Sequence, residues 1–405
     1  MIDLVLRRTA LVGSVLAFGG AAIVSSASCA DSEAGTAGDE DASTTIGSQD
    51  GGVDASDDAP SDSGPCDAAD PNCVTDPISC DEAAWCPVAT PLPRESALAA
   101  VWGWGKNDVL AVGSGGVVLR WDGTTWSRLP SPSGKSTFFT VWGTGSDEIW
   151  LASGTDALFH ATSLVDGNPD WKAEPNLTGD PFNTATLFAI WGSGAGDVRV
   201  AGGTYNLDTP EGFVPGNQFV RSGAPAPWTG IAGNGIVRGI WGSAATDVWL
   251  LVDNSGTNPS EKGATFHGTG KDAESLAWKA VDSQATVGLL GIWGSSADDV
   301  WAVGEAGTIR RMTPNARRWA PVASPTNKTL RAIWGSGAND VWAVGDAGTV
   351  LHWDGTLWTD SVAAFPAGAK PNLYGVWGAG PDDVWIVGDG VVLRATGKKI
   401  TGGGS

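Results

Sequence analysis

Acidic and basic side chains recur at matching places along most of this chain. In each of seven similar segments, an aspartate opens or precedes one β-prone run, and a histidine or an arginine stands near the end of the next run. Such a set could form a metal site or a basic ring. The residues in question are Asp108 and Arg120, Asp147 and His160, Asp197 and Arg221, Asp247 and His267, Asp299 and Arg311, Asp340 and His352, and Asp383 and Arg394.

The composition of this set favours a structural role. All three histidines of the protein belong to it, but four of the seven basic positions are arginine, which does not ligate metals. Two consecutive runs that form a hairpin bring the start of the first beside the end of the second. We therefore predict that each aspartate pairs with the base of its own segment, and we predict no metal site and no cofactor.

Four further cysteines stand close together as Cys66, Cys73, Cys80 and Cys86, separated by gaps of six, six and five residues. A zinc site would normally use short Cys-x-x-Cys pairs, which are absent. In an exported protein, disulfides are the better interpretation. Four cysteines allow three connectivities, and spacing does not choose among them.

Catalytic motifs are hard to find in this sequence. Sialidase-like chemistry would need a tyrosine nucleophile with a glutamate, and no such arrangement surrounds the only two tyrosines, Tyr205 and Tyr374. The sequence has no nucleophile elbow, phosphate-binding loop or dinucleotide fingerprint. We predict that the protein is not an enzyme.

The elements that carry these side chains belong to a repeat. A Trp-Gly pair opens seven units at spacings of 40, 49, 50, 52, 41 and 43 residues. In the clearest unit, the ranges 330–335, 340–345 and 349–354 and a run from Trp358 read as four short strands joined by Gly- and Asp-containing turns. Four strands in about 40 residues form one blade of a β-propeller. The seven units start at Trp102, Trp142, Trp191, Trp241, Trp293, Trp334 and Trp377.

A second series of tryptophans predicts how the ring closes. Six units have a tryptophan at the fourth strand, namely Trp126, Trp171, Trp228, Trp278, Trp319 and Trp358. The seventh unit lacks one, and Trp85 stands before the first unit in a similar context. We therefore predict an all-β, seven-bladed propeller over residues 85–397, in which the strand at Trp85 completes the last blade. Tryptophans in a fixed register are expected to fill the wedges between blades rather than to stack on sugars.

The chain before the propeller reads as an export signal and a tether. Arg7 and Arg8 precede an apolar stretch, and Ser-Ala-Ser leads to Cys29. We predict a signal peptide over residues 1–29 with lipidation of Cys29, and ordinary signal cleavage is the alternative. Residues 30–64 read as a disordered acidic linker, 65–84 as a disulfide-stapled segment and 398–405 as a flexible tail. The predicted location is the cell envelope, either on the outer membrane through the lipid or in the periplasmic or extracellular space.

Charge is concentrated in the tether. The net charge is −21, and residues 30–86 contain fifteen acids and no base, whereas residues 87–405 contain 29 acids and 22 bases. A basic face is missing, which argues against nucleic-acid binding.

The unit Trp-Gly-x4-Asp-Val-Trp-Ala-Val-Gly-x2-Gly-x3-His-Trp-Asp-Gly-Thr-x-Trp resembles the Trp-rich propeller repeats of exported myxobacterial and related proteobacterial lipoproteins. It is more distantly similar to Asp-box sialidase-like propellers and to propellers of the photosystem II assembly factor type. Asp122 and Asp354 open turns that approximate an Asp-box. The resemblance implies a binding protein at the surface or in the periplasm.

Three insertions indicate where recognition could take place. Units two, three and four are the long ones, with extra residues in 173–186, 203–217 and 254–263. In a propeller these connections share one face, and loops on a rigid scaffold often bind ligands. The candidate contact residues are Phe182, Tyr205, Phe213 and Asn217. We predict a monomer that binds a protein through this face. The alternatives are a lectin-like propeller that binds a glycan and, after that, a glycoside hydrolase.

Overall fold

The computed structural model describes residues 66, 69–154, 157–178, 180, 182–210, 212–223, 227–256 and 262–398. The predicted signal segment with Cys29, the linker 30–64 and all but the first residue of the tail 398–405 lie outside the described residues. Within the described ranges, no helix is long and apolar enough to cross a membrane.

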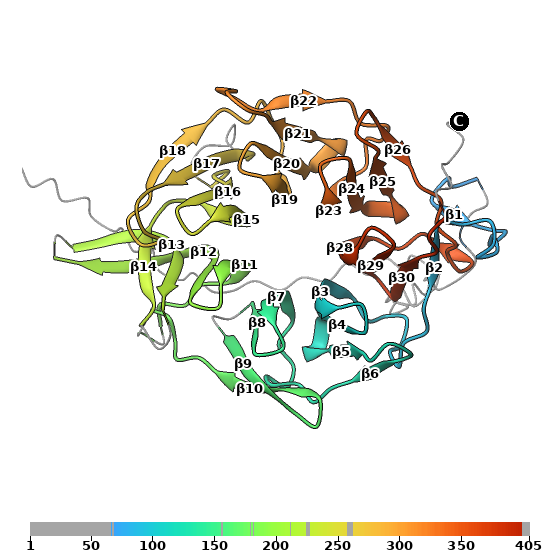
Figure 1. The fold of residues 1–405 in the computed structure, drawn as a ribbon, viewed down its shortest axis with the longest axis horizontal. Coiled ribbons are helices and arrows are strands. Elements are labelled where there is room, and N and C mark those ends of the chain that lie inside the picture. Colours follow the sequence, from blue (N-terminus) through green and yellow to red (C-terminus); the bar gives the residue numbers. More distant parts are fainter. Residues whose placement is uncertain are drawn as a thin grey trace, which may run out of the picture. The chain divides into compact units, whose positions relative to one another are not determined.

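Seven sheets of four antiparallel strands stand in a ring, which confirms the predicted seven-bladed propeller (Figure 1). Each blade runs from an inner strand a to an outer strand d. Blade one has β3 (Leu98–Gly105), β4 (Asp108–Gly113), β5 (Val118–Trp121) and β6 (Trp126–Arg128), and blade two has β7 (Phe138–Gly145), β8 (Glu148–Ser153), β9 (Leu158–Val165) and β10 (Asn168–Ala173). Blade three has β11 (Leu187–Gly194), β12 (Asp197–Thr209), β13 (Gly212–Ser222) and β14 (Thr229–Ala232), and blade four has β15 (Ile236–Ala244), β16 (Asp247–Asp253), β17 (Ala264–Thr269) and β18 (Ala277–Val281).

The remaining blades follow the same order, except at the seam. Blade five has β19 (Leu289–Ser296), β20 (Asp299–Gly304), β21 (Ile309–Met312) and β22 (Ala320–Val322), and blade six has β23 (Leu330–Gly337), β24 (Asp340–Gly345), β25 (Val350–Trp353) and β26 (Trp358–Asp360). Blade seven combines β28 (Leu373–Gly380), β29 (Asp383–Gly388) and β30 (Val391–Ala395) with β2 (Trp85–Pro87), and β1 (Cys73–Val74) pairs with β27 (Gly368–Ala369) outside the blades. Short 3-10 turns lie at Ser114–Gly116, Glu305–Gly307 and Asp346–Gly348.

Local sequence explains the strands and their turns. The b strands are rich in Val, Ile and Trp, and almost every residue in them is buried, as in β24, because neighbouring blades cover both faces. In the turn between β5 and β6, the carboxylate of Asp122 accepts hydrogen bonds from the backbone N–H groups of Thr124 and Thr125, both at 2.8 Å. Gly123 follows Asp122 with a φ of 99°, a conformation that favours glycine. These bonds, with the Thr124 hydroxyl bond, lower the pKa of Asp122 to about 2.

The Trp-Gly pairs form the inner joints of the ring. Each tryptophan of an a strand lies on the glycine of the next blade's Trp-Gly pair, so closely that a Cβ atom on that glycine would meet the indole Cη2. The joint between blades seven and one, Trp377 on Gly103, repeats the others, with 2.9 Å between Cη2 and the Cβ position. The other six joints are Trp102 on Gly143, Trp142 on Gly192, Trp191 on Gly242, Trp241 on Gly294, Trp293 on Gly335 and Trp334 on Gly378, at 2.5–2.7 Å.

The N-terminal strand closes blade seven as predicted. In β2, Trp85, Cys86 and Pro87 pair with Ala395, Arg394 and Leu393 of β30. The Trp85 side chain is fully buried, packs edge-on against Trp342 at 4.8 Å between ring centroids, and donates its Nε1–H to Ser361 Oγ at 3.1 Å. The seam therefore contains the same kind of contact as the interior of the ring.

Two disulfides hold the segment that leads into this strand, Cys66–Cys73 and Cys80–Cys86. The first lies beside the two-residue pairing of β1 with β27, in which Cys73 faces Ala369. The second ends on Cys86, within the closing strand itself. Of the three connectivities open at the sequence level, the structure has the one that joins sequence neighbours.

Candidate functional site

Five of the seven predicted acid–base pairs form within their own blade. The carboxylate of the b strand lies 2.5–2.9 Å from the base of the c strand in these five blades. The pairs are Asp108 with Arg120, Asp247 with His267, Asp299 with Arg311, Asp340 with His352, and Asp383 with Arg394.

Four of these bases, and His160 of blade two, also lie on a tryptophan that fills the wedge toward the next blade. The imidazole rings stack on the b-strand indole at 3.7–4.1 Å between centroids, and the arginine Cζ atoms lie 4.5–4.8 Å from the indole centroid. A tryptophan that lies in the d strand of the next blade, or directly before it, packs against the same indole. The groups are His160, Trp150 and Trp228; His267, Trp249 and Trp319; Arg311, Trp301 and Trp358; His352, Trp342 and Trp85; and Arg394, Trp385 and Trp126.

The predicted pair of Asp147 with His160 is wrong. Asp147 is exposed, and the next residue, Glu148, is buried and lies 3.0 Å from His160 Nε2. The reason is register, because in blade two and in blades four to seven the carboxylate stands two residues before the b-strand tryptophan, here Trp150. Counting back from that tryptophan would have identified Glu148 from sequence.

The predicted pair of Asp197 with Arg221 is also wrong. In the β12–β13 ladder Arg221 faces Val198, and its neighbour Val220 faces Arg199. Successive side chains of a strand point to opposite faces, so Arg221 turns toward blade two while Asp197 accepts a hydrogen bond from Ser193 Oγ at 2.7 Å. Arg199 occupies the tryptophan position of this blade, is buried, and reaches the Trp278 ring of blade four at 5.6 Å.

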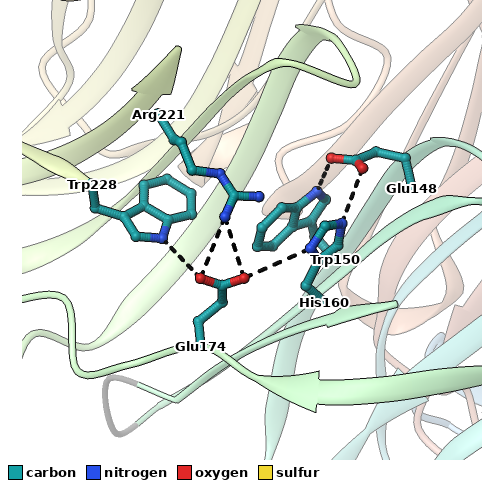
Figure 2. A network of polar contacts seen from close by, with 6 residues as sticks. All are labelled: Glu148, Trp150, His160, Glu174, Arg221 and Trp228. Atoms are coloured by element: carbon teal, nitrogen blue, oxygen red, sulfur yellow. Dashed lines mark hydrogen bonds and ion pairs between the residues drawn. The ribbon is translucent and has the colours of Figure 1, made fainter. Parts of the chain in front are cut away.

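Arg221 joins a polar network that ties blade two to blade three (Figure 2). Its guanidinium Nη1 lies 3.3 Å from Glu174 Oε1, and its Cζ lies 4.5 Å from the Trp150 centroid. The Nε1–H of Trp228 donates to Glu174 Oε2 at 3.3 Å, and His160 Nδ1 lies 3.7 Å from Glu174 Oε1. Nothing in the sequence pattern singled out Glu174, because it follows the d strand and has no counterpart in the repeat.

Glu148 completes the network on the other side of the histidine. It also accepts the Nε1–H of Trp150 at 2.8 Å. The nearby His160 imidazole lowers the pKa of Glu174 most, aided by the Trp228 hydrogen bond and the Arg221 charge, and these effects outweigh the rise caused by burial. The network is therefore charged and internally satisfied, and it fixes the start of the connection that follows β10.

That connection and the β12–β13 hairpin contain two of the three insertions. The hairpin is continuous strand to its turn, with Asp208 facing Phe213 and Thr209 facing Gly212, and it projects from the ring in Figure 1. Asn183 of the connection donates from Nδ2 to the carbonyl of Asn206 at 2.6 Å and accepts from the N–H of Asn206 at 2.8 Å. The third insertion lies in the β16–β17 connection, where residues 257–261 lie outside the described residues.

Two of the four candidate contact residues lie exposed on the β10–β11 connection and the β12–β13 hairpin. Phe182 is 96% exposed and Phe213 is 76% exposed. We call the surface formed by the described residues of 173–186 and 203–217 the loop platform. The side chains of Glu174 and Asn183 tie its first segment to Arg221 of blade three and to Asn206 of the hairpin. The phenyl rings of Phe182 and Phe213 are thus exposed to solvent on segments that hydrogen bonds hold together.

The other two candidates, Tyr205 and Asn217, are buried and are not contact residues. Tyr205 stacks on Phe219 at 4.3 Å and donates its hydroxyl to the Gln218 carbonyl at 2.6 Å, and burial raises its pKa. Asn217 Nδ2 donates to the Asn234 carbonyl at 2.9 Å. The insertion lengthens the strands instead of forming a loop, so its alternate side chains remain on the buried face.

A metal site would require several of the acid–base residues to gather around one point. The ranges that the structure describes contain no group of three or more His, Cys, Asp or Glu side chains placed to hold a metal ion. A groove of about 440 Å³ between blades four and five contains His267, but this imidazole is bonded to Asp247. The acid–base register thus belongs to blade packing.

Comparison with solved structures supports the fold. The chain is similar to a structure of YCF48 bound to D1 peptide, with a TM-score of 0.58, 19% identity and coverage of 79% of this chain and 99% of that one. It is similar to YCF48 from Cyanidioschyzon merolae, with a TM-score of 0.57, 17% identity and coverage of 77% and 98%. The WD40 β-propeller domain of Doa1 matches with a TM-score of 0.52, 12% identity and coverage of 77% and 96%.

These identities show a shared fold and no more. Neither a protein-family model nor a curated protein matches the sequence. The chain is thus a β-propeller of the architecture found in YCF48 and WD40 propellers.

Proposed function

We propose that this protein is an exported, non-catalytic scaffold that holds a protein partner on the loop platform. The observation that carries the proposal is the exposure of Phe182 and Phe213 on a backbone that hydrogen bonds brace. A backbone that hydrogen bonds already hold in place costs less to order on binding, and aromatic residues are enriched where proteins meet.

The similar structures support a binding role. One of the YCF48 structures is of a peptide complex, and YCF48 and Doa1 share the propeller ring with this chain. Among the described residues, the histidines and arginines that would be needed for catalysis are committed to blade packing. We propose on this basis that the protein catalyses no reaction.

The test is capture of a partner by the full chain from native envelope extract. Replacing Phe182 and Phe213 with serine is expected to abolish capture of the wild-type partner, while the folded fraction and the melting temperature stay unchanged. Leu357, which is 52% exposed in the turn between β25 and β26, gives the matched control Leu357→Ser. If the double variant retains the same partner at the same yield, the platform is not the binding surface.

A glycan is the second candidate partner, because exposed phenyl rings can also stack on sugars. Binding of the wild-type chain, but not of the double variant, to a glycan array would favour it over a protein. Release of sugars from the bound glycan would instead show that the protein is a glycoside hydrolase.

We also propose that the chain is exported and anchored by a lipid on Cys29. The two disulfides support passage through an oxidising compartment. A Cys29→Ser variant expressed in the source cells should lose labelling by a fatty-acid probe and move from the membrane fraction to the supernatant. Equal labelling of this variant and the wild type would refute lipidation at Cys29.

A further inference from the structure

The loop platform combines its aromatic rings with charge of one sign. Its two segments, 173–186 and 203–217, contain four acids and no lysine or arginine. Elsewhere in residues 87–405 the charges nearly balance, with 25 acids and 22 bases. In the sequence these acids are Glu174, Asp180, Asp208 and Glu211, of which Glu211 lies outside the described residues. This excess of negative charge suits a cationic partner.

Each exposed phenylalanine has an aspartate as a near neighbour in the fold. The N–H of Phe182 donates to Asp180 Oδ1 at 2.9 Å, so this carboxylate is held at the backbone of Phe182. Phe213 faces Asp208 across the β12–β13 ladder. Asp180 and Asp208 are exposed, and neither forms an ion pair within the described ranges.

Glu174, the third acid of the platform that the structure describes, already forms ion pairs inside the protein. Glu174 pairs with Arg221 and His160 in the network that joins blades two and three. The structure thus distinguishes an internal carboxylate from two outward ones, and only the outward ones accompany exposed rings.

We infer that the partner presents arginine side chains to these two Phe–Asp units, an inference that rests on the proposed function of the platform. A guanidinium can lie flat on a phenyl ring and donate hydrogen bonds to an adjacent carboxylate at the same time. Lysine can supply the charge but has no planar group for the ring, and a neutral side chain supplies neither. The partner is accordingly a protein segment with two arginines among apolar residues.

The first experiment measures binding of synthetic peptides to the full chain by fluorescence anisotropy. The probes are twelve-residue peptides that alternate leucine with arginine, lysine or glutamine. The order of affinity is expected to be arginine, then lysine, then glutamine, and the arginine peptide should bind less tightly as salt rises. Equal binding of the arginine and glutamine peptides would overturn the inference.

Variants of the loop platform test where the arginine peptide binds. The double variant Asp180→Asn with Asp208→Asn keeps the size of both side chains and an oxygen acceptor for the Phe182 N–H. It is expected to lower the affinity for the arginine peptide about tenfold. The matched control is Asp298→Asn with Asp382→Asn, which removes two exposed acids elsewhere and should leave binding unchanged. Unchanged binding by the platform variant would also overturn the inference.

Capture from envelope extract separates this inference from the proposed function. If capture depends on Phe182 and Phe213 but is insensitive to the two aspartates and to salt, the platform binds proteins and the inferred arginine chemistry is wrong. If capture is insensitive to the phenylalanines as well, the proposed function itself fails.

Discussion

One methylene group distinguishes the carboxylate of blade two from those of blades four to seven. Glu148 reaches both His160 and the Nε1–H of Trp150. Where aspartate stands instead, the equivalent indole N–H groups of Trp249, Trp301, Trp342 and Trp385 are buried without a hydrogen-bond partner among the described residues. The longer side chain therefore satisfies a donor that the shorter one leaves unpaired.

Shortening this side chain should be costly. Glu148→Asp is expected to lower the free energy of unfolding by about 1 kcal/mol, because the buried Trp150 N–H loses its acceptor. Urea denaturation followed by circular dichroism measures the change. The reciprocal variant, Asp247→Glu, brings an acceptor to Trp249 and should not destabilise the protein. If it lowers stability as much as Glu148→Asp does, the hydrogen bond is not the cause.

The Glu174 carboxylate should make stability depend on pH. Because folding lowers its pKa, the charged form stabilises the folded chain above the ordinary glutamate value of 4.5, and this contribution is lost as the pH falls through the lowered pKa. The unfolding free energy of the wild type should therefore fall more steeply between pH 5 and pH 3 than that of Glu174→Gln. Parallel curves for the two proteins would contradict this assignment.

At the scale of the strand, the glycine of each Trp-Gly pair is a packing requirement. A Cβ atom at Gly378 would lie 2.6 Å from Trp334 Cη2, whereas one at Gly380, in the same strand, would have no atom within 4 Å. Gly378→Ala is expected to lower the unfolding free energy by about 1–3 kcal/mol. Thermal denaturation of Gly378→Ala and Gly380→Ala tests this, and equal melting temperatures would show that the joint is loose.

Strand register separates what the sequence predicts well from what it does not. The Trp-Gly spacing predicts every blade, because each inner joint needs both residues. A shift of one residue moves a side chain to the other face, so the predicted partners of Asp147 and Arg221 are wrong although the seven predicted blades are confirmed. The prediction for Tyr205 is wrong for a related reason, since composition does not show that an insertion continues a ladder.

Closure of the ring is a property of the whole molecule. Trp85 fills the seam from a strand far away in sequence from β30. Trp85→Ala is expected to lower the unfolding free energy by about 3–5 kcal/mol, as for other large buried side chains. Chemical denaturation measures the loss, and Trp85→Phe, which keeps an aromatic ring, should lose less. Wild-type stability of the alanine variant would mean that the N-terminal strand does not hold the ring closed.

The seven indole-on-glycine joints form a closed circle in which the chain could begin at any blade. The joint of Trp377 on Gly103 is equivalent to the other six, so the innermost wall of the ring does not reveal where the polypeptide starts. Only the outer strand of blade seven, supplied by β2, marks that point. A circularly permuted gene that joins the natural ends and opens the chain between two other blades would preserve all seven joints, and its product should assemble the same ring.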